Sequence, residues 1–492
     1  MHNDTDNLLS SKSSNIKIYA VIMLACIAVF LPKLQNDCFW LIKIGEHIVE
    51  RGFPVTEPLT YHTGLYYPVQ QWLSAVIFFI IHKYFSFTGL YALTLLFSIF
   101  ISIATYKLCM LLSNESKVIS ISIVLISTAI MMLVFAVPRP QIFSYLIFIL
   151  EIMFLEKHLK TNRYKYIVFI VLLSIILINL HAALWVFFFL LFIPYLFDGI
   201  PWITNLLSVE CHNKNKVLSL AMFTCLLSGF INPYGVDNIL YSLNSFGTGT
   251  DFIGEMLPPH FGHSTGIILF IYLCLLFAVY TFFNGKTTIR FALITLGTVY
   301  MSLLSYRNFA LLVVCSVPLL AYYLKDFIDT DKDSKTENQF PLNKFLVFMV
   351  SFIVANSICV LLNIRNIVLD KSIIPDKAVD YIMQNIDISE MKLYNGFNTG
   401  GYLEFRGIKP FIDSRAEVFT KNINKKEDIL TDEINLYKRK VYYQDIFDKY
   451  GFTHWLIDVN FPLNNFMSRD NRFKKIYEDE QFVIYTNVSK QS

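Results

Sequence analysis

Long apolar runs dominate the chain between residues 16 and 364. A helix needs about 20 apolar residues to cross a bilayer, and fewer when it is short or re-entrant. The pattern therefore predicts a multi-pass α-helical membrane protein. The expected membrane segments are 16–35, 70–84, 88–112, 140–157, 164–179, 182–198, 217–232, 266–283, 288–305, 308–325 and 343–363.

The stretch 117–137 fits either one full span or two short half-spans folded as a hairpin. The basic loop 157–165 should face the cytoplasm, because Lys and Arg concentrate in cytoplasmic loops. With the N-terminus inside, that placement requires 117–137 to cross twice. The sequence thus predicts about 13 segments in the cytoplasmic (inner) membrane, a cytoplasmic N-terminus and an extracytoplasmic C-terminus.

The first outer loop, 36–69, opens with apolar residues at roughly helical spacing, among them Phe39 and Trp40, interleaved with charged residues. This pattern is typical of an amphipathic helix that lies in the plane of the membrane interface. Gly52 and Pro54 then end the helix.

The composition changes after Asn363, where no further spanning segment occurs and acidic residues become frequent. The pattern divides the chain into a polytopic domain, 1–365, and a small soluble extracytoplasmic α/β domain, 371–492. The expected strands are Met391–Tyr394, Pro410–Asp413, His454–Asp458 and Phe482–Thr486, and the expected helices are Asp376–Gln384 and Tyr437–Tyr450.

Composition agrees with a membrane protein. Of 492 residues, 55% are hydrophobic and 16% are charged, against about 25% charged in soluble domains. The net charge of +3 and the lack of a basic stripe exclude nucleic-acid binding. The eight cysteines are scattered without CxxC or His/Cys ligand spacing, so neither a disulfide framework nor a zinc site is expected.

The predicted topology places five polar residues at the outer membrane face: Asp37, Arg139, His181, Glu255 and Arg307. Asp37 follows the first span and is either a solvated carboxylate or a catalytic acid. Glu255 is either a helix-capping loop acid or a second catalytic carboxylate. An inverting glycosyl transfer needs one group that removes a proton from the acceptor, and either residue can serve.

The two arginines are either side chains that snorkel to the interface or ligands of a phosphate. Guanidinium suits the second role, because its fixed fork matches phosphate oxygens and stays charged near lipid. His181 either satisfies a break between two helices or contacts phosphate or acceptor. The glycines between Asn395 and Tyr402 form neither GxGxxG nor a P-loop, and turn chemistry accounts for them.

Three motifs near the start of the chain resemble the first outer loop of bacterial GT-C-type membrane glycosyltransferases. The resemblance is to a branch related to dolichyl-phosphate-mannose protein mannosyltransferases. They are Asn36-Asp-Cys-Phe-Trp-Leu, Gly52-Phe-Pro-Val-Thr-Glu-Pro and Gln70-Gln-Trp-Leu. Similar landmarks further along the chain are Arg139-Pro-Gln, Asn179-Leu-His, Asn232-Pro-Tyr-Gly, Glu255, Tyr306-Arg-Asn, Gly400-Gly-Tyr-Leu, Phe411-Ile-Asp-Ser-Arg and Tyr450-Gly-Phe-Thr-His-Trp.

The resemblance implies a GT-C fold and an inverting transfer of a sugar from a polyprenyl-phosphate-linked donor to a glycan, lipid or protein acceptor, among membrane lipids. In the family pattern Asp37 is the catalytic candidate. Trp40, Glu57 and Gln71 join Arg139, His181 and Arg307 as candidate substrate-binding residues. Gln71 stands where the family has Glu, which removes one acid. No metal ligand is assigned, and a divalent cation stays open as a cofactor.

Two other functions remain as alternatives. A lipid-glycan transporter or flippase would show internal repeats and broken helices near the midplane, and the sequence shows no repeat. An O-antigen-type polymerase or ligase would use a diphosphate-linked donor, with which two phosphate-binding arginines are equally compatible. The sequence names neither the sugar nor the acceptor.

Overall fold

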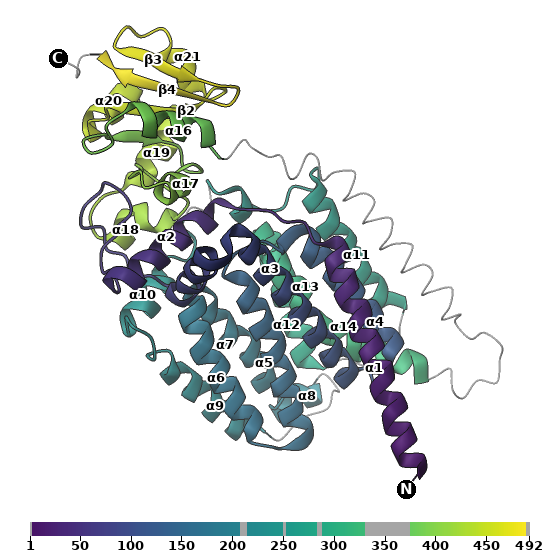
Figure 1. Ribbon diagram of the computed structural model, residues 1–492. Helices are drawn as coiled ribbons and strands as arrows, with labels where there is room; N and C mark the ends of the chain where they lie inside the picture. The colour runs from purple at the N-terminus through teal and green to yellow at the C-terminus, as the bar shows by residue number, and fades with distance from the viewer. Residues whose placement is uncertain (1, 207–213, 249–251, 283–287, 330–373, 489–492) are drawn as a thin grey trace. The chain divides into compact units, whose positions relative to one another are not determined.

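The computed structural model describes residues 2–206, 214–248, 252–282, 288–329 and 374–488 (Figure 1). The expected span 343–363 and the expected domain boundary at 365–371 lie outside these residues. Packing divides the chain into two compact units. The bundle unit comprises residues 1–33, 91–231 and 253–367, and the composite unit comprises 34–90, 232–252 and 368–492.

The bundle unit is helical in its described residues. Its elements are α1 (His2–Val29), the later part of α3 (Trp72–Leu112), α4 (Lys117–Ile130), η1 (Met131–Phe135), α5 (Gln141–Thr161), α6 (Lys165–Leu180), α7 (Ala182–Phe197), α8 (Pro201–Leu206), α9 (Asn215–Ser228), η2 (Gly254–Met256), α11 (Ser264–Phe282), α12 (Ile289–Leu304), η3 (Tyr306–Asn308), α13 (Phe309–Cys315) and α14 (Val317–Asp329). The spans expected from 140 to 325 each correspond to one of these helices, or to α13 and α14 together.

The length and composition of these helices suit a membrane. Among the described residues, three helices are long and apolar enough to cross a bilayer: Trp72–Leu112, Lys117–Phe135 and Tyr306–Lys325. Six shorter apolar helices accompany them: Ile16–Val29, Lys165–Leu180, Ala182–Phe197, Asn215–Ser228, Thr265–Thr281 and Ile289–Leu304.

The predicted hairpin within 117–137 is wrong. Helix α4 continues directly into the π-helical turn η1, so that Lys117–Phe135 forms one helix of 19 residues. No Gly or Pro occurs in this stretch to reverse the chain. A continuous helix also satisfies every backbone group inside its own segment, which a sharp reversal in lipid would not.

Helix α3 (Trp72–Leu112) contains the two expected segments 70–84 and 88–112, joined at a kink. Its 41 residues would extend about 61 Å as one helix, roughly twice the hydrocarbon thickness of a bilayer. Ser86 interrupts the helix with φ 56° and ψ −159°, a strained conformation for a residue with a side chain. The boundary between the two compact units falls shortly after, between Leu90 and Tyr91.

Opposite ends of α5 carry different polar groups. Near its C-terminal end, Glu156 accepts a 2.7 Å hydrogen bond from Arg290, which also pairs with Asp198 after α7. Arg139 directly precedes the N-terminal end. The bundle unit therefore has one end with a buried Arg290 ion-pair group and another end that carries Arg139.

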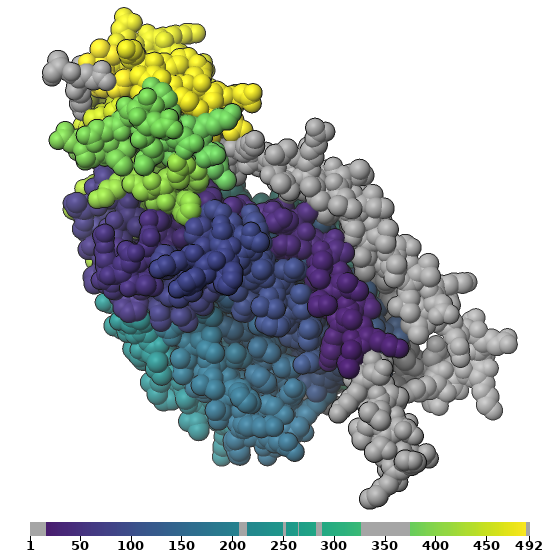
Figure 2. Space-filling model, viewed as in Figure 1, coloured from purple at the N-terminus to yellow at the C-terminus, as the bar shows by residue number. Residues whose placement is uncertain are grey.

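The composite unit begins with α2 (Asn36–Arg51), which confirms the helix expected at the start of the first outer loop. Helix α2 is followed directly by Gly52, whose φ of 88° favours glycine and ends the helix. Its apolar side is buried by protein: Phe39 shares a core with Tyr402 and Leu403. Helix α17 (Gly400–Phe405) lies beside α2 in Figure 1, and green atoms lie directly on purple ones in the space-filling view (Figure 2).

The C-terminal part of the composite unit holds a four-stranded sheet with the order β1-β2-β4-β3. Its strands are β1 (Leu393–Asn395), β2 (His454–Asp458), β3 (Phe473–Glu478) and β4 (Phe482–Asn487). Strands β1 and β2 are parallel, and the other neighbours are antiparallel. The segment 232–252 contributes α10 (Val236–Asn244), and the helices of the C-terminal part are α16 (Asp376–Asn385), α17, η6 (Ala416–Phe419), α18 (Lys421–Asn424), α19 (Ile429–Tyr437), α20 (Tyr443–Tyr450) and α21 (Pro462–Met467).

Three details of this part of the chain differ from the sequence prediction. Residues 410–413 are not a strand, because the Asn395 side chain takes their backbone groups: it accepts from Phe411 N and donates to Ile412 O, both at 2.8 Å. Strand β3 was not predicted, since its charged and half-exposed residues hide the alternation that marks a strand. The expected helix 437–450 is split into the end of α19 and α20.

Candidate functional site

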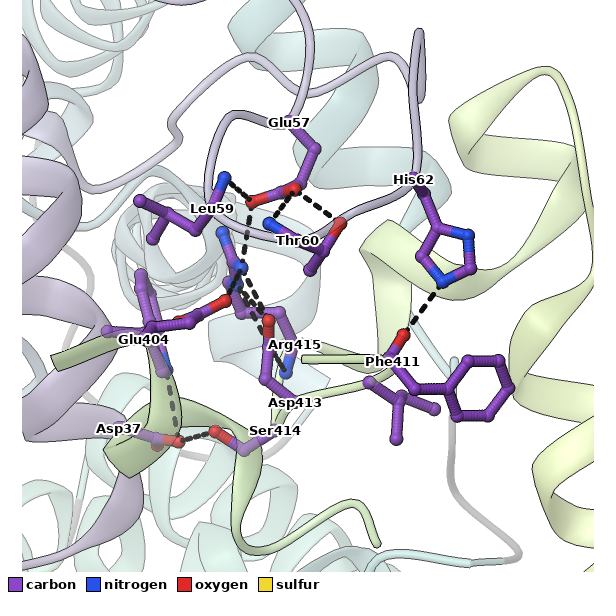
Figure 3. Close-up of polar contacts among 12 residues, drawn as sticks. Asp37, Glu57, Leu59, Thr60, His62, Glu404, Phe411, Asp413, Ser414 and Arg415 are labelled. Carbon is purple, nitrogen blue, oxygen red and sulfur yellow. Dashed lines mark hydrogen bonds and ion pairs between the residues drawn. The ribbon is translucent and has the colours of Figure 1, made fainter. Parts of the chain in front are cut away.

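Asp37 lies in the first turn of α2, where the helix dipole favours a negative charge. Its Oδ1 accepts a 2.6 Å hydrogen bond from the Ser414 hydroxyl and a 3.4 Å bond from Trp40 Nε1 (Figure 3). Both donors stabilise the carboxylate form and fix its orientation. The C-terminal segment therefore supplies one of the groups that hold this candidate catalytic residue.

Two helical glycines bring α17 close enough for this contact. A Cβ on Gly400 would lie 2.0 Å from Ile412 O, and one on Gly401 would lie 2.8 Å from Asn36 O. Neither position tolerates a side chain without movement of backbone. The turn chemistry expected from the sequence does not describe these two glycines: they allow close packing of α17 against α2 and against the segment that ends in Ser414.

A buried guanidinium lies next to Ser414 in the sequence. Arg415, only 2% exposed, pairs with Asp413, with Glu404 at 2.9 Å and with Glu57 at 3.0 Å. Figure 3 shows the three carboxyl groups converging on it. Its guanidinium carbon also lies 5.2 Å from the centre of the Trp40 ring, a cation–π contact.

Three carboxyl groups around one guanidinium leave an excess of negative charge in a dry site. Burial, and then the neighbouring Asp413, raises the pKa of Glu404 well above its ordinary value, although Arg415 opposes this. This shift of the pKa favours the protonated form of Glu404. A buried carboxyl group without its own counter-ion gives up its charge in this way.

The other candidates of the first outer loop have internal partners. Glu57 accepts hydrogen bonds from Leu59 N, Thr60 N and Thr60 Oγ1, at 2.9, 2.8 and 2.7 Å, in addition to Arg415. Trp40 is buried. Gln71 is half-buried, and its backbone carbonyl accepts from Ala75 N at the start of α3. Roles for these three residues in substrate binding stay predictions.

In the bundle unit, two loops that are distant in sequence are joined by an ion pair. Arg139 Nη1 donates to Glu255 Oε2 at 2.7 Å, with the Glu255 side chain 39% exposed. The loop of Glu255 is tied to that of Arg307, because Ser305 Oγ donates to Glu255 O at 3.2 Å and Tyr306 N donates to Leu257 O at 3.1 Å. We call Arg139, His181, Glu255 and Arg307 the cationic cluster.

His181 lies in this cluster as a neutral imidazole. It separates α6 from α7 and is buried, with Nδ1 2.9 Å from Ser144 Oγ. Burial, together with the positive charges of Arg307 and Arg139, lowers the pKa of His181 to about 3. The sequence left open whether His181 serves the helix break or contacts a ligand. In the structure His181 lies at the break between α6 and α7, and both arginines are near enough to affect its pKa.

Metal binding is not supported by the donor groups that the structure describes. Within those residues, no group of three or more His, Cys, Asp or Glu side chains is placed to hold an ion. The carboxyl groups Glu57, Glu404 and Asp413 are bound to Arg415 instead. The described residues thus contain no ready-made set of metal ligands.

The sequence interpretation missed Ser414, Asp413, Arg415 and Glu404 as parts of this region. The run Phe411-Ile-Asp-Ser-Arg was noted only as a landmark. The sequence does contain one useful signal. Three polar residues, Asp413, Ser414 and Arg415, directly follow the apolar Phe411 and Ile412, and this segment lacks the alternating charges of a surface helix. Their partners Asp37 and Glu57 lie more than 350 positions away, which no local pattern reveals.

Comparisons with known proteins give fold-level relatives only. No protein-family model matches the chain, and no curated protein matches it in sequence. ArnT from Cupriavidus metallidurans matches in two crystal structures. The one bound to undecaprenyl phosphate gives a TM-score of 0.54 at 12% identity, over 97% of this chain and 98% of that one. The apo structure gives 0.58 at 11% identity, over 98% and 99%.

A third match is the Archaeoglobus fulgidus oligosaccharyltransferase in complex with Zn and sulfate. It gives a TM-score of 0.50 at 11% identity, over 96% of this chain and 73% of that one. These matches confirm the expected fold class: a multi-pass, GT-C-like helical membrane fold with a small C-terminal α/β domain.

Proposed function

We propose that this chain is a membrane glycosyltransferase that moves a sugar from polyprenyl phosphate to a glycan, lipid or protein acceptor. The observation that carries the proposal is the fold shared over nearly the whole chain with ArnT, which was crystallised with undecaprenyl phosphate. The likeness to an oligosaccharyltransferase supports the same class of reaction. The acceptor and the sugar are left open.

Asp37 is proposed as the general base. The acceptor oxygen attacks the anomeric carbon, the bond between that carbon and the phosphate oxygen breaks, and the acceptor proton passes to the Asp37 carboxylate. Attack opposite the leaving phosphate inverts the anomeric configuration. Ser414 and Trp40 support this role, because their bonds to Oδ1 keep the carboxylate oriented before the acceptor arrives.

The cationic cluster is proposed to bind the phosphate that leaves with the lipid. Arg139 and Arg307 match phosphate oxygens and offset the negative charge that grows as the sugar departs. Glu255 holds Arg139 through the 2.7 Å ion pair and so orients it. This gives Glu255 a positioning role beside the catalytic role that the sequence left open. His181, neutral beside the two arginines, can offer one further hydrogen bond.

The proposed topology differs from the sequence prediction at two places. We propose that Trp72–Phe85 lies outside the bilayer, since it packs in the composite unit and α3 is too long for one span. The single helix Lys117–Phe135 crosses once. Each change removes one crossing, so the parity is unchanged. With the expected span 343–363, eleven crossings keep the N-terminus in the cytoplasm and the C-terminal domain outside.

Asp37→Asn tests the proposal most directly. The full-length protein is purified into proteoliposomes that contain undecaprenyl-phosphate-linked sugars, and transfer to a lipid or glycan acceptor is followed by mass spectrometry. We expect the turnover number to fall by roughly 10²–10⁴-fold, the usual contribution of a general base. Glu50→Gln, an exposed acid on the same helix, is the matched control and should leave transfer unchanged.

Unchanged turnover in Asp37→Asn would refute the proposed role of this residue. Movement of lipid-linked glycan across the bilayer without any product, unaffected by Asp37→Asn, would instead favour a flippase. Turnover only with a diphosphate-linked oligosaccharide would favour a polymerase or ligase.

A further inference from the structure

A pocket that does not include Asp37 lies at the sheet of the composite unit. It encloses about 450 Å³, within the range of about 300–1,000 Å³ usual for small-molecule pockets. The pocket opens where the parallel strands β1 and β2 end. Gly396–Thr399 follow β1, Asp458 ends β2, and Asn460–Pro462 come shortly after it. Ligands of open α/β sheets bind at such carboxyl ends, because the chains diverge there.

Aromatic rings form much of the wall. Tyr437, at the end of α19, and Phe461, just before α21, stack at 5.6 Å with an angle of 18° between their planes. Phe252 contacts both Phe397 and Tyr437, with ring centres 5.3 and 5.8 Å apart. Tyr437 is nevertheless 54% exposed, so its ring is accessible to a ligand in the pocket.

The stacked pair also borders a second hollow of about 210 Å³, whose wall includes Arg439, Tyr442 and Phe466. Tyr437 and Phe461 line both hollows. Tyr442 and Phe466 are each more than half exposed. The two hollows are therefore neighbouring subsites on either side of one aromatic pair, as a ligand built of repeating units would require.

A nearly buried carboxyl group faces the larger hollow. Glu433, on α19, is 2% exposed and lines the pocket. Among the described residues its hydrogen-bond partner is the Tyr394 hydroxyl, which donates to Oε2 at 3.1 Å. Burial raises the pKa of Glu433 to about 8, although the bond from Tyr394 opposes this. Glu433 thus keeps its proton at neutral pH and can donate a hydrogen bond from its other oxygen to a ligand hydroxyl.

We infer that the two hollows bind a neutral oligosaccharide, with one sugar ring on each side of the Tyr437–Phe461 pair. A sugar ring offers apolar C–H faces that suit aromatic rings and a rim of hydroxyls that suits Glu433, Asp458 and Asn460. A lipid chain would offer no hydrogen-bonding group to the second oxygen of Glu433, whose first oxygen accepts from Tyr394. A peptide that adds to a sheet needs an open strand edge, and the pocket lies at strand ends.

The assignment of this oligosaccharide as the acceptor rests on the proposed function, whereas saccharide binding does not. Phe252, which forms part of the wall, stands three positions before Glu255 in the chain. A sugar in the larger hollow therefore contacts Phe252, and the residues that line the hollow include neither Asp37 nor a member of the cationic cluster. This gives a glycan acceptor a recognition site outside the reacting groups.

The test measures binding and transfer separately. Full-length protein in nanodiscs is titrated with cellotetraose, maltotetraose and chitotetraose, and binding is followed by calorimetry and saturation-transfer NMR. We expect one or more of these probes to bind, and Tyr437→Ala to weaken binding by roughly tenfold, the loss of one aromatic contact. Glu433→Gln should weaken it less. Tyr84→Ala, at an exposed tyrosine that lines neither hollow, should bind as the unmodified protein does.

Asp37→Asn separates this inference from the proposed function. The variant should bind the oligosaccharide normally and fail to transfer, while Tyr437→Ala should raise KM for a long glycan acceptor with little change in kcat. The inference is overturned if no saccharide binds, if Tyr437→Ala binds as well as the unmodified protein, or if a peptide library binds at the pocket instead. Absence of transfer in every variant, with saccharide binding retained, would refute only the proposed function.

Discussion

The surroundings of Asp37 and the cationic cluster have opposite charge balances. Near Asp37, the three carboxyl groups of Glu57, Glu404 and Asp413 are bound to one guanidinium, that of Arg415, in a dry interior. In the cationic cluster, Arg139 pairs with Glu255, whose side chain is 39% exposed, and Arg307 adds a second positive charge. One region has carboxyl groups to spare, and the other has positive charge to spare.

This difference separates two chemical tasks. A carboxylate that accepts a proton must be held in a fixed orientation. The ion pairs of Arg415 fix the neighbouring Ser414, which donates to Asp37. A group that receives an anionic leaving phosphate must keep positive charge that the protein itself does not neutralise. The comparison predicts that damage to the first region unfolds structure, whereas damage to the second reduces activity in a folded protein.

Arg415→Met should cause the largest effect. Removal of one partner from a buried ion-pair network typically costs about 3–5 kcal/mol, because uncompensated charge stays buried. We expect a marked fall in the thermal unfolding midpoint of the detergent-solubilised full-length protein, with transfer lost. Differential scanning fluorimetry measures the midpoint.

Arg472→Met provides the matched control in the same domain. Arg472 pairs with Asp470 at 2.6 Å, but its side chain is 45% exposed, and such surface pairs contribute little. If Arg415→Met unfolded at the same temperature as Arg472→Met, the network around Arg415 would not be the rigid support described above.

Arg139→Gln should reduce turnover without unfolding the protein. Loss of one donor to a developing negative charge costs about 2.7–4 kcal/mol, or 10²–10³-fold in kcat. Arg307→Gln should act similarly, and the double variant should lose less than the product of the two, because both arginines serve one phosphate. Steady-state kinetics with the polyprenyl-phosphate donor measures these effects.

Arg163→Gln, an exposed residue in the loop between α5 and α6, is the control for loss of a positive charge. A lower unfolding midpoint in Arg139→Gln, with kcat preserved in the folded fraction, would mean that the cationic cluster is structural. The contrast between the two regions would then fail.

Much of the fold could be predicted because apolar runs report helices directly. The spans from 140 to 325, helix α2 and the strands His454–Asp458 and Phe482–Asn487 follow from local periodicity. The hairpin at 117–137 was wrong because it was inferred from the parity of crossings and not from the residues themselves. The parity depended on the first part of α3, whose packing in the composite unit no hydropathy pattern reveals.

The candidate site could be predicted only in part. Arg139 and Glu255 were proposed separately from their positions at helix ends, and the structure joins them in an ion pair. The contact of Asp37 with Ser414, 377 positions apart, depends on tertiary packing. The role of Gly401 also depends on tertiary packing. A glycine needed for the close approach of two helices cannot be told from one needed for a turn in the sequence alone.

Gly401→Ala should produce the smallest effect and tests how closely Asp37 depends on α17. Its new Cβ would lie 2.8 Å from Asn36 O and 3.5 Å from the Trp40 ring, so the backbone next to Asp37 must shift. Such overpacking typically costs about 1–3 kcal/mol. We expect a modest fall in the unfolding midpoint and a fall in kcat that exceeds it, because the displaced residues flank Asp37.

Gly297→Ala is the matched control, since Gly297 is also helical but a Cβ there meets nothing within 4 Å. Alanine favours helix over glycine by up to about 1 kcal/mol, so this variant should be as stable as the unmodified protein or slightly more so. If Gly401→Ala behaved like Gly297→Ala in both stability and kcat, α17 would not position Asp37. The bond from Ser414 would then be incidental to catalysis, and the support for Asp37 would have to come from Trp40 and α2 alone.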